Sequence, residues 1–320
     1  MDVLSDVLRA VRLTGAVFFD VERRAPWVAE TPEGAVIACK VMPEAHHVIV
    51  FHAVLKGECW VEAPAIPGAS IRLQEGDVII LPKADRHVLC SSPGMRAEPE
   101  IENYYRPDNR PLPFFIGPGD GTGDAAHFVC GYLGCDVRPF NPIIDGLPRL
   151  FHVPMSDTSK SLMALFMLAV AETESRRTGG ETILARLAEL LFVDALRRYI
   201  DNLPTEEPSW FSGLRDPHIG AALNLIHGRW REEWTVDRLA REVGLSRSVF
   251  ASRFAHFVGQ APIHYMTTWR MQLATHLLQR NGANVSRVAN EVGYESEAAF
   301  CRTFKRCVGM TPGHWRRRLH

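Results

Sequence analysis

The pattern of apolar and polar residues changes character along the chain. The first third holds short segments rich in β-branched and apolar residues, separated by turns such as Lys56-Gly57 and Pro67-Gly68. Short strands at close spacing are typical of an antiparallel sandwich or barrel. We therefore expect strands over 35–40, 48–55, 59–62, 70–73, 78–81 and 87–91, a long Pro- and Gly-rich loop over 92–126, and a further strand from His127.

Helical spacing replaces this pattern in the middle of the chain. Residues 156–175 and 181–200 carry apolar side chains at i, i+3 and i+4, which predicts two amphipathic helices. Two interpretations remain open for this pair: the helices pack on the barrel, or they form a dimer interface. The segment 201–216 is polar and interrupted by prolines, so we expect an interdomain linker there.

The last hundred residues contain one helix–turn–helix pattern twice. VDRLAREVG, which starts at Val236, recurs as VSRVANEVG, which starts at Val285, and a short turn and a second helical stretch follow each copy. A helix, a glycine-containing turn and a second helix place a recognition helix in the DNA major groove. Two copies in one chain predict contact with two successive grooves, as expected of a DNA-binding transcription regulator.

Caps and core positions of the repeat follow from local chemistry. Thr235, Ser246, Asn284 and Ser296 stand where helix N-caps belong. Gly244 and Gly293 stand in turns where a left-handed backbone favours glycine. The expected core residues of the second helices are Phe250, Phe254 and Phe257 in the first copy, and Phe300, Phe304 and Val308 in the second.

Charge separates the two ends of the chain. The whole chain has 36 Lys/Arg and 37 Asp/Glu, but residues 217–320 hold 15 and 7 of them, which leaves 21 and 30 for the rest. A basic module behind an acidic one is typical of a nucleic-acid binder fused to another domain. No run reaches the roughly 18–20 apolar residues of a membrane span. The amphipathic, acidic N-terminus does not resemble a secretory signal. We expect a cytoplasmic protein whose seven cysteines are reduced thiols.

The repeat resembles the AraC/XylS family of transcription regulators. The second signature of that family runs through GYESEAAFCRTFKRCVGMTPGHWR almost as written here, from Gly293. VLKGECWVE from Val54 and LQEGDVIILPKADRHVL from Leu73 resemble the two blocks of cupin barrels. GGETILARLAELLFVDALRRY from Gly179 resembles the helical end of one sensor branch, which includes regulators that respond to reactive chlorine species.

The resemblance implies an α+β chain with a cupin-like antiparallel β-barrel, a helical hairpin and an all-α double helix–turn–helix domain. We place the sensor barrel at 1–155, the helical dimerisation or packing segment at 156–200, the linker at 201–216 and the DNA-binding domain at 217–320. The family positions for base contacts, with the outward residues beside them, give the DNA-binding candidates Arg247, Ser248, Ala251, Ser252, Glu297, Ala298, Cys301, Arg302 and Lys305.

Individual side chains of these helices suggest different roles. Arg302 is the expected bidentate contact to guanine. Phosphate contacts, which position a protein on DNA without specifying sequence, are expected from basic residues. The candidates are Arg247, Arg253, Lys305, Arg306 and the run 316–318, of which Arg247 and Lys305 are also DNA-binding candidates named above.

The sequence leaves open two kinds of signal that the barrel could sense, a bound metal or the oxidation of a thiol. Neutral imidazoles of His46, His52 and His87 suit a divalent metal, although no acidic residue lies between Val48 and Leu55, where cupin metal sites carry a carboxylate. The second input is thiol oxidation. Cys130 matches a cysteine that recurs in the reactive-chlorine branch, and Cys90 lies in a strand expected to adjoin it. A thiol near a His or Arg would have a lowered pKa. The redox candidates are Cys59, Cys90, Cys130 and Cys135.

The function expected from the sequence is an effector-responsive DNA-binding transcription regulator that is not an enzyme. Regulators of the family that this chain resembles more often activate transcription than repress it. Its partners would be double-stranded DNA, RNA polymerase, a small-molecule or oxidant effector, and a second copy of the chain. Two alternatives remain: a metal-dependent cupin enzyme fused to a DNA-binding tail, and a regulator whose barrel only dimerises.

Overall fold

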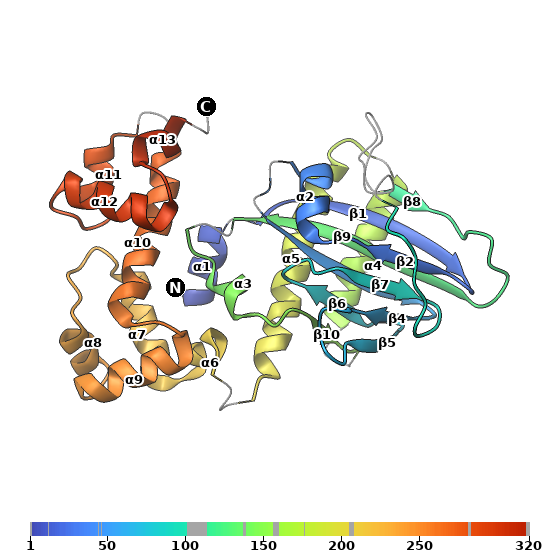
Figure 1. The fold of residues 1–320 in the computed structure, drawn as a ribbon, viewed down its shortest axis with the longest axis horizontal. Helices are drawn as coiled ribbons and strands as arrows, with labels where there is room; N and C mark the ends of the chain where they lie inside the picture. Colours follow the sequence, from blue (N-terminus) through green and yellow to red (C-terminus); the bar gives the residue numbers. More distant parts are fainter. Residues whose placement is uncertain are drawn as a thin grey trace. The chain divides into compact units, whose positions relative to one another are not determined.

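A computed structural model gives the fold, which consists of two compact units (Figure 1). It describes residues 2–11, 13–43, 45, 47–100, 114–136, 139–155, 160–175, 177–204, 208–280 and 283–317. The barrel unit contains Leu13–Asp136 and Leu147–Asn202. The helical unit contains Met1–Arg12, Val137–Gly146 and Leu203–His320.

Two sheets form the barrel unit. One has the order β10-β6-β3-β9-β1-β8 and the other β2-β7-β4-β5. All recorded pairings are antiparallel except that of β1 with β8. The strands are β1 (Leu13–Arg24), β2 (Val28–Thr31), β3 (His47–Lys56), β4 (Glu58–Glu62), β5 (Ser70–Gln74), β6 (Val78–Leu81), β7 (His87–Cys90), β8 (Phe114–Ile116), β9 (Ala125–Cys135) and β10 (Phe151–Val153). The predicted α+β fold with an amino-terminal barrel is confirmed.

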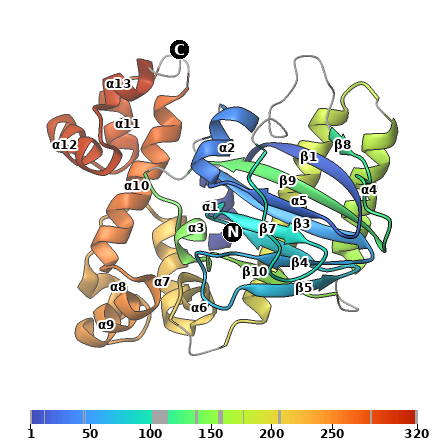
Figure 2. The same cartoon turned by 45° about the vertical axis from the view of Figure 1, so that its right-hand side comes forward.

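Two helices cover one face of the six-stranded sheet, α4 (Lys160–Ser175) and α5 (Gly180–Asp201) (Figure 2). Phe51 on β3 packs against Phe166 on α4, with ring centroids 6.3 Å apart. Both faces of β3 are therefore covered, which explains why nearly all of its side chains are buried. The helix pair packs on the barrel, as one of the two sequence interpretations proposed.

The predicted strand over 35–40 is wrong, because this segment forms the helix α2 (Gly34–Val41). Ile37 and Val41, four residues apart, are buried on one face of that helix, while Val36 is 42% exposed. Tertiary packing thus overrides the strand preference of the β-branched residues. The predicted loop over 92–126 is also partly wrong: it contains β8 and the start of β9, while 101–113 lie outside the described residues.

The helical unit contains both helix–turn–helix copies. The first is α8 (Val236–Glu242) with α9 (Arg247–Val258), and the second is α11 (Val285–Glu291) with α12 (Glu297–Val308). The 17-residue helix α10 (Pro262–Leu278) connects them. The other helices are α1 (Val3–Val11), α3 (Pro142–Gly146), α6 (Trp210–Arg215), α7 (Pro217–Gly228) and α13 (Pro312–Arg317). No described helix has the length and hydropathy needed to cross a membrane.

The predicted caps of both copies are confirmed. The side chains of Thr235, Ser246, Asn284 and Ser296 each accept a hydrogen bond from a backbone N–H of the first helical turn. The turn glycines have φ of +73° at Gly244 and +80° at Gly293, where an L side chain would be strained.

Five of the six predicted core residues of the second helices are buried, and one prediction is wrong. Phe257 is only partly buried, because its ring lies at the rim of an open groove beside α9. The ring also lies under the guanidinium of Arg253, 5.5 Å from its centroid.

The prediction of a linker over 201–216 is wrong for its second half. Ser209 caps the short helix α6, and Trp210 and Phe211 are buried. The indole of Trp210 donates a hydrogen bond to the hydroxyl of Tyr265 on α10, at 3.1 Å. Two buried aromatic side chains outweigh the polar, Pro-rich composition around them, so this segment belongs to the core of the helical unit.

Candidate nucleic-acid interface and barrel cavity

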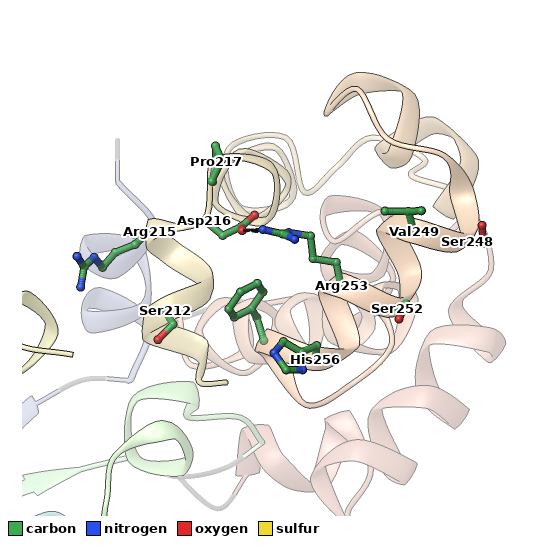
Figure 3. A pocket seen from close by; sticks show the side chains of 10 residues that line it. Ser212, Arg215, Asp216, Pro217, Ser248, Val249, Ser252, Arg253 and His256 are labelled. Carbon is green, nitrogen blue, oxygen red and sulfur yellow. Dashed lines mark hydrogen bonds and ion pairs between the residues drawn. The ribbon is translucent and has the colours of Figure 1, made fainter. Parts of the chain in front are cut away.

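The first candidate surface lies along α9 (Figure 3). Ser248, Ser252 and His256 are exposed and line a groove of about 1040 Å³, whose opposite wall comes from the end of α6 and the start of α7. Arg247 is also exposed, and it forms an ion pair with Asp237 at 3.1 Å in which both side chains are more than half exposed. Ala251 is partly buried. At the positions predicted for base contacts, α9 therefore presents only small side chains.

Arg253 differs from the other basic residues of α9, because it points across the groove to Asp216 (Figure 3). Its Nε and Nη2 both donate to the Asp216 carboxylate, whose side chain is 5% exposed. That carboxylate also caps α7 by accepting from the backbone N–H groups of His218 and Ile219. Burial alone would raise the pKa of Asp216, but the Arg253 guanidinium and these N–H groups lower it below its ordinary value. Arg253 thus has a structural partner in addition to the phosphate role predicted for it.

The second candidate surface lies along α12, where Glu297, Ala298, Arg302 and Lys305 are exposed. Within the described part of the chain, the side chains of Arg302 and Lys305 have no hydrogen-bond or ion-pair partner. Cys301 is only partly exposed and packs against the core beneath α12. Burial, with the charge of Glu297, raises the pKa of its thiol. α12 therefore offers two unpaired cations and one acid beside a small apolar side chain.

The barrel unit encloses a cavity of about 80 Å³. Its lining is mostly apolar and comes from both sheets: Phe19, Val21, Arg23, Ala29, Thr31, His52, Leu89, Ile116, Phe128, Cys130, Gly131 and Tyr132. Cys130 on β9 lies directly opposite Phe19 on β1 and His52 on β3 in the sheet register. The cavity thus has a thiol and an imidazole side by side on one wall.

A hydrogen-bonded chain runs from this thiol into the protein. Nδ1 of His87 lies 2.7 Å from the backbone carbonyl of Asp85, which can only accept, so the proton is on Nδ1. Nε2 of His87 must then accept from Nε2 of His52, at 2.8 Å. That leaves Nδ1 of His52 as the acceptor for the thiol of Cys130, at 2.7 Å. The Asp85 carbonyl thereby fixes both ring tautomers.

The expectation of a lowered thiol pKa at Cys130 is wrong. Burial raises the pKa of this thiol well above its ordinary value, and the nearby Arg23 offsets this only in part. Burial likewise lowers the pKa of His52 well below its ordinary range and the pKa of His87 to about 4. The three groups are therefore neutral at pH 7, since burial in a low dielectric disfavours every charged form.

The other redox candidates have no hydrogen bond to this cluster among the described residues, although Cys59 is near enough to raise the pKa of the Cys130 thiol. Cys90 is on β7, which pairs with β2 and β4, so the prediction that its strand adjoins that of Cys130 is wrong. Its thiol pKa is raised by burial. Burial also raises the pKa of Cys59 to about 12 and that of Cys135 to about 12. These three side chains are buried, in positions typical of packing cysteines.

The structure gives no support to the suggested metal site. Among the described residues, no group of three or more His, Cys, Asp or Glu side chains is arranged to hold a metal ion. Both ring nitrogens of His52 are engaged, one by His87 and the other by Cys130. His46, the third suggested ligand, lies outside the described residues.

One buried side-chain amide in the helical unit forms hydrogen bonds to two segments that are distant from it in the sequence. Gln272 on α10 is 1% exposed. Its Nε2 donates to the backbone carbonyl of Ala10 at the end of α1, at 2.7 Å, and its Oε1 accepts from the backbone N–H of Phe140, at 3.3 Å. The ring of Phe140 also meets Tyr265 edge-on, at 5.2 Å between centroids. α1 and the segment around Phe140 are therefore fastened to the helix that joins the two helix–turn–helix copies.

Three of these residues, Arg23, Asp216 and Gln272, were not among those predicted from the sequence. Arg23 and Gln272 are single polar residues in stretches without a motif, and only the fold reveals their surroundings. Asp216 had a visible signal, because an Asp directly before Pro217 and an apolar run is typical of a helix N-cap.

Comparisons with known proteins cover nearly the whole chain. A sequence profile described as cupin matches residues 2–201, and one described as a helix–turn–helix domain matches residues 239–318. An AraC-like transcription regulator of Streptomyces lividans is 30% identical over 318 residues, which are 99% of this chain and 98% of that protein. The HTH-type transcriptional regulator AlkR of Acinetobacter baylyi is 27% identical over 99% of both chains. The RCS-specific HTH-type transcriptional activator RclR of Escherichia coli K12 is 27% identical over 85% of both chains.

Proposed function

This chain belongs to the AraC-like transcription regulators that carry an amino-terminal cupin domain, and we propose that α9 and α12 read its operator while the barrel cavity holds its effector. The chain is a DNA-binding transcription regulator rather than an enzyme, as its relatives are regulators. The observation that carries the proposal for DNA reading is the pair of exposed cations on α12, Arg302 and Lys305, whose side chains have no partner among the described residues.

The second recognition helix carries most of the base specificity. Arg302 donates its two parallel N–H groups to N7 and O6 of a guanine, a contact available only to a guanidinium without another partner. Glu297 accepts from a cytosine amino group, Ala298 meets a thymine methyl group, and Cys301 stands at the edge of the same surface. On α9, Ser248, Ala251 and Ser252 are small, so this helix approaches the bases closely and reads fewer of them.

The two recognition helices enter successive major grooves on one face of the DNA. α10 has 17 residues, so the helix that connects the two copies is roughly 25 Å long. Successive major grooves on one face lie about 34 Å apart. A single chain thereby reads two groove segments, and a dimer reads two such half-sites.

Lys305 supplies a phosphate contact, and its removal tests the proposed interface. Lys305→Ala should weaken binding about equally for every DNA sequence and should reduce the slope of log affinity against log salt by about 1, because one fewer counterion is released. Fluorescence anisotropy with labelled duplexes at several salt concentrations measures this slope. Arg72→Ala, which removes a half-exposed charge of the barrel unit on β5, is the matched control and should leave the slope unchanged. An unchanged slope in Lys305→Ala removes α12 from the phosphate-contacting surface.

Self-association would use the outer face of the helix pair in the barrel unit. Met167 and Leu168 on α4, with Ile183 and Leu190 on α5, are between 43% and 56% exposed. Exposed apolar side chains on two neighbouring helices favour contact with a second copy of the chain. The transcriptional output that we propose is activation through RNA polymerase, in line with the name of one relative.

A signal from the cavity has two covalent routes into the helical unit. β1 and β9 both line the cavity. β1 begins two residues after α1 ends, and β9 ends shortly before the segment that carries Phe140. Gln272 holds both α1 and Phe140. An effector that shifts either strand therefore changes the positions of backbone groups that are bonded to α10.

A further inference from the structure

The wall of the barrel cavity combines a thiol, a base and a cation in otherwise apolar surroundings. We propose that Cys130 is a covalent modification site for a small α,β-unsaturated aldehyde or ketone, with His52 as the base that activates its thiol. The inference rests on the proposed role of the cavity as the effector site, and it adds the chemical class of the effector.

The direction of the hydrogen bonds suits nucleophilic addition. The Asp85 carbonyl and His87 hold His52 with an unprotonated Nδ1 facing the thiol of Cys130, 2.7 Å away. An unprotonated imidazole in contact with a thiol, itself oriented by a third group, is the arrangement that activates cysteine nucleophiles. His87 plays the orienting part here. The two imidazoles are buried and Cys130 is only partly exposed. Because all three groups are neutral at rest, the thiol stays unreactive until an electrophile enters the cavity beside it.

The lining selects the size and polarity of the electrophile. A cavity of about 80 Å³ is smaller than the roughly 150 Å³ of an apolar cavity that holds benzene. It therefore suits a molecule of a few heavy atoms. Phe19, Phe128 and Ile116 offer no partner for a charged ligand.

Arg23 is the single cation among the cavity-lining residues. Its guanidinium also donates to the backbone carbonyl of Gly117, which ties it in place, and its charge acts on Cys130. A guanidinium in this position stabilises negative charge on a carbonyl oxygen of the bound molecule.

The reaction balances without an oxidant or a leaving group. The sulfur of Cys130 bonds to the β-carbon of the conjugated carbonyl while the thiol proton moves to Nδ1 of His52. The electron pair of the carbon–carbon double bond shifts to give an enolate, whose oxygen faces Arg23. His52 then returns the proton to the α-carbon. The product is a saturated carbonyl joined to Cys130 by a thioether, and the imidazole is neutral again.

Crotonaldehyde is the test compound, with butanal as its saturated control. The full-length protein is exposed to each compound at equal concentration and analysed by intact mass and by peptide mapping over time. We expect crotonaldehyde to add the mass of one molecule at Cys130 before it modifies the exposed Cys39, and butanal to add none. Preferential modification of Cys39, with Cys130 unchanged, would overturn the proposal. So would oxidation of Cys130 by dilute hypochlorous acid under conditions in which crotonaldehyde leaves it unmodified.

Two further readouts test the role of His52. His52→Gln should slow modification of Cys130 by about 100-fold or more, the usual effect of removing a positioned base. In the unaltered protein, the rate of modification at Cys130 should change by no more than about a factor of two between about pH 6.5 and 9, because His52 remains neutral throughout this range. Glutathione, a free thiol with an ordinary pKa near 8.5, should react faster as pH rises. A pH profile at Cys130 that follows glutathione contradicts the proposal even if the His52 variant fails to fold.

The same samples separate this inference from the proposed function. DNA affinity is measured before and after modification, with Cys130→Ser as the unmodified control. An adduct that forms without any change in DNA affinity supports the chemistry of Cys130 and contradicts the cavity as the effector site. A change in DNA affinity that persists in Cys130→Ser contradicts the covalent step and leaves the proposed function intact.

Discussion

Replacing Gln272 by Met should release the segment around Phe140 from α10 and weaken the attachment of α1. Methionine matches glutamine in length but can neither donate to the carbonyl of Ala10 nor accept from the N–H of Phe140. The N–H of Phe140 then has no partner, which costs about 1–3 kcal/mol for a buried backbone group. The carbonyl of Ala10 keeps a hydrogen bond from Nε2 of His276 on the same helix, at 2.5 Å. Amide hydrogen exchange at Phe140 should therefore accelerate by about 5-fold to 150-fold, and that of α1 by less, as measured by mass spectrometry on the full-length protein.

The matched control for Gln272→Met is Thr267→Ala on the same helix. Thr267 is partly exposed, and among the described residues its hydroxyl bonds only to the carbonyl of Ile263 within α10. We expect no change in the exchange of α1 or Phe140 in this variant. Equal exchange in Gln272→Met and the unaltered protein would show that packing alone, for example that of Phe140 on Tyr265, fastens both segments. Gln272 would then have no part in coupling the cavity to the DNA-binding helices.

Replacing Arg302 by Ala should remove discrimination at one base pair of the operator. A bidentate arginine–guanine contact is worth about 1–3 kcal/mol of preference for the correct base. The affinity ratio between the preferred duplex and one with that guanine replaced should thus fall by about 5-fold to 150-fold. Anisotropy titrations of the four possible base pairs at that position measure the ratio directly.

Arg302→Lys separates base reading from simple charge. Lysine keeps the positive charge but lacks the planar pair of N–H donors that matches guanine. Overall affinity should stay closer to that of the unaltered protein in Arg302→Lys than in Arg302→Ala, while the loss of base preference should be similar in both. If either variant kept its full base preference, another residue of α12 would have to be the one that recognises that base pair.

The sequence was informative wherever function is encoded in local spacing. The repeated VDRLAREVG pattern, the cap residues such as Ser246, and the glycines at 244 and 293 act within a few residues of one another. Their geometry is therefore the same in any fold that contains the motif. The helix–turn–helix pair and the exposed face of α12 could be predicted for this reason.

Features that depend on distant contacts could not be predicted. The contact of Cys130 with His52 joins strands that are 78 residues apart, and that of Gln272 with Ala10 spans 262 residues. The predicted thiol pKa had the wrong direction because a neighbouring His and Arg were considered without the burial that outweighs them. The helix over Gly34–Val41 shows the same effect on secondary structure, since its buried face forms only in the folded barrel.

Selection of binding sites from a random DNA library with the full-length protein tests the central claim most directly. If α9 and α12 both read bases from successive major grooves, the selected sequences contain two conserved blocks whose centres lie about 10–10.5 base pairs apart. The block read by α12 should be the more sharply conserved and should contain the guanine that Arg302 contacts. A single conserved block, or two blocks at variable spacing, would contradict the account.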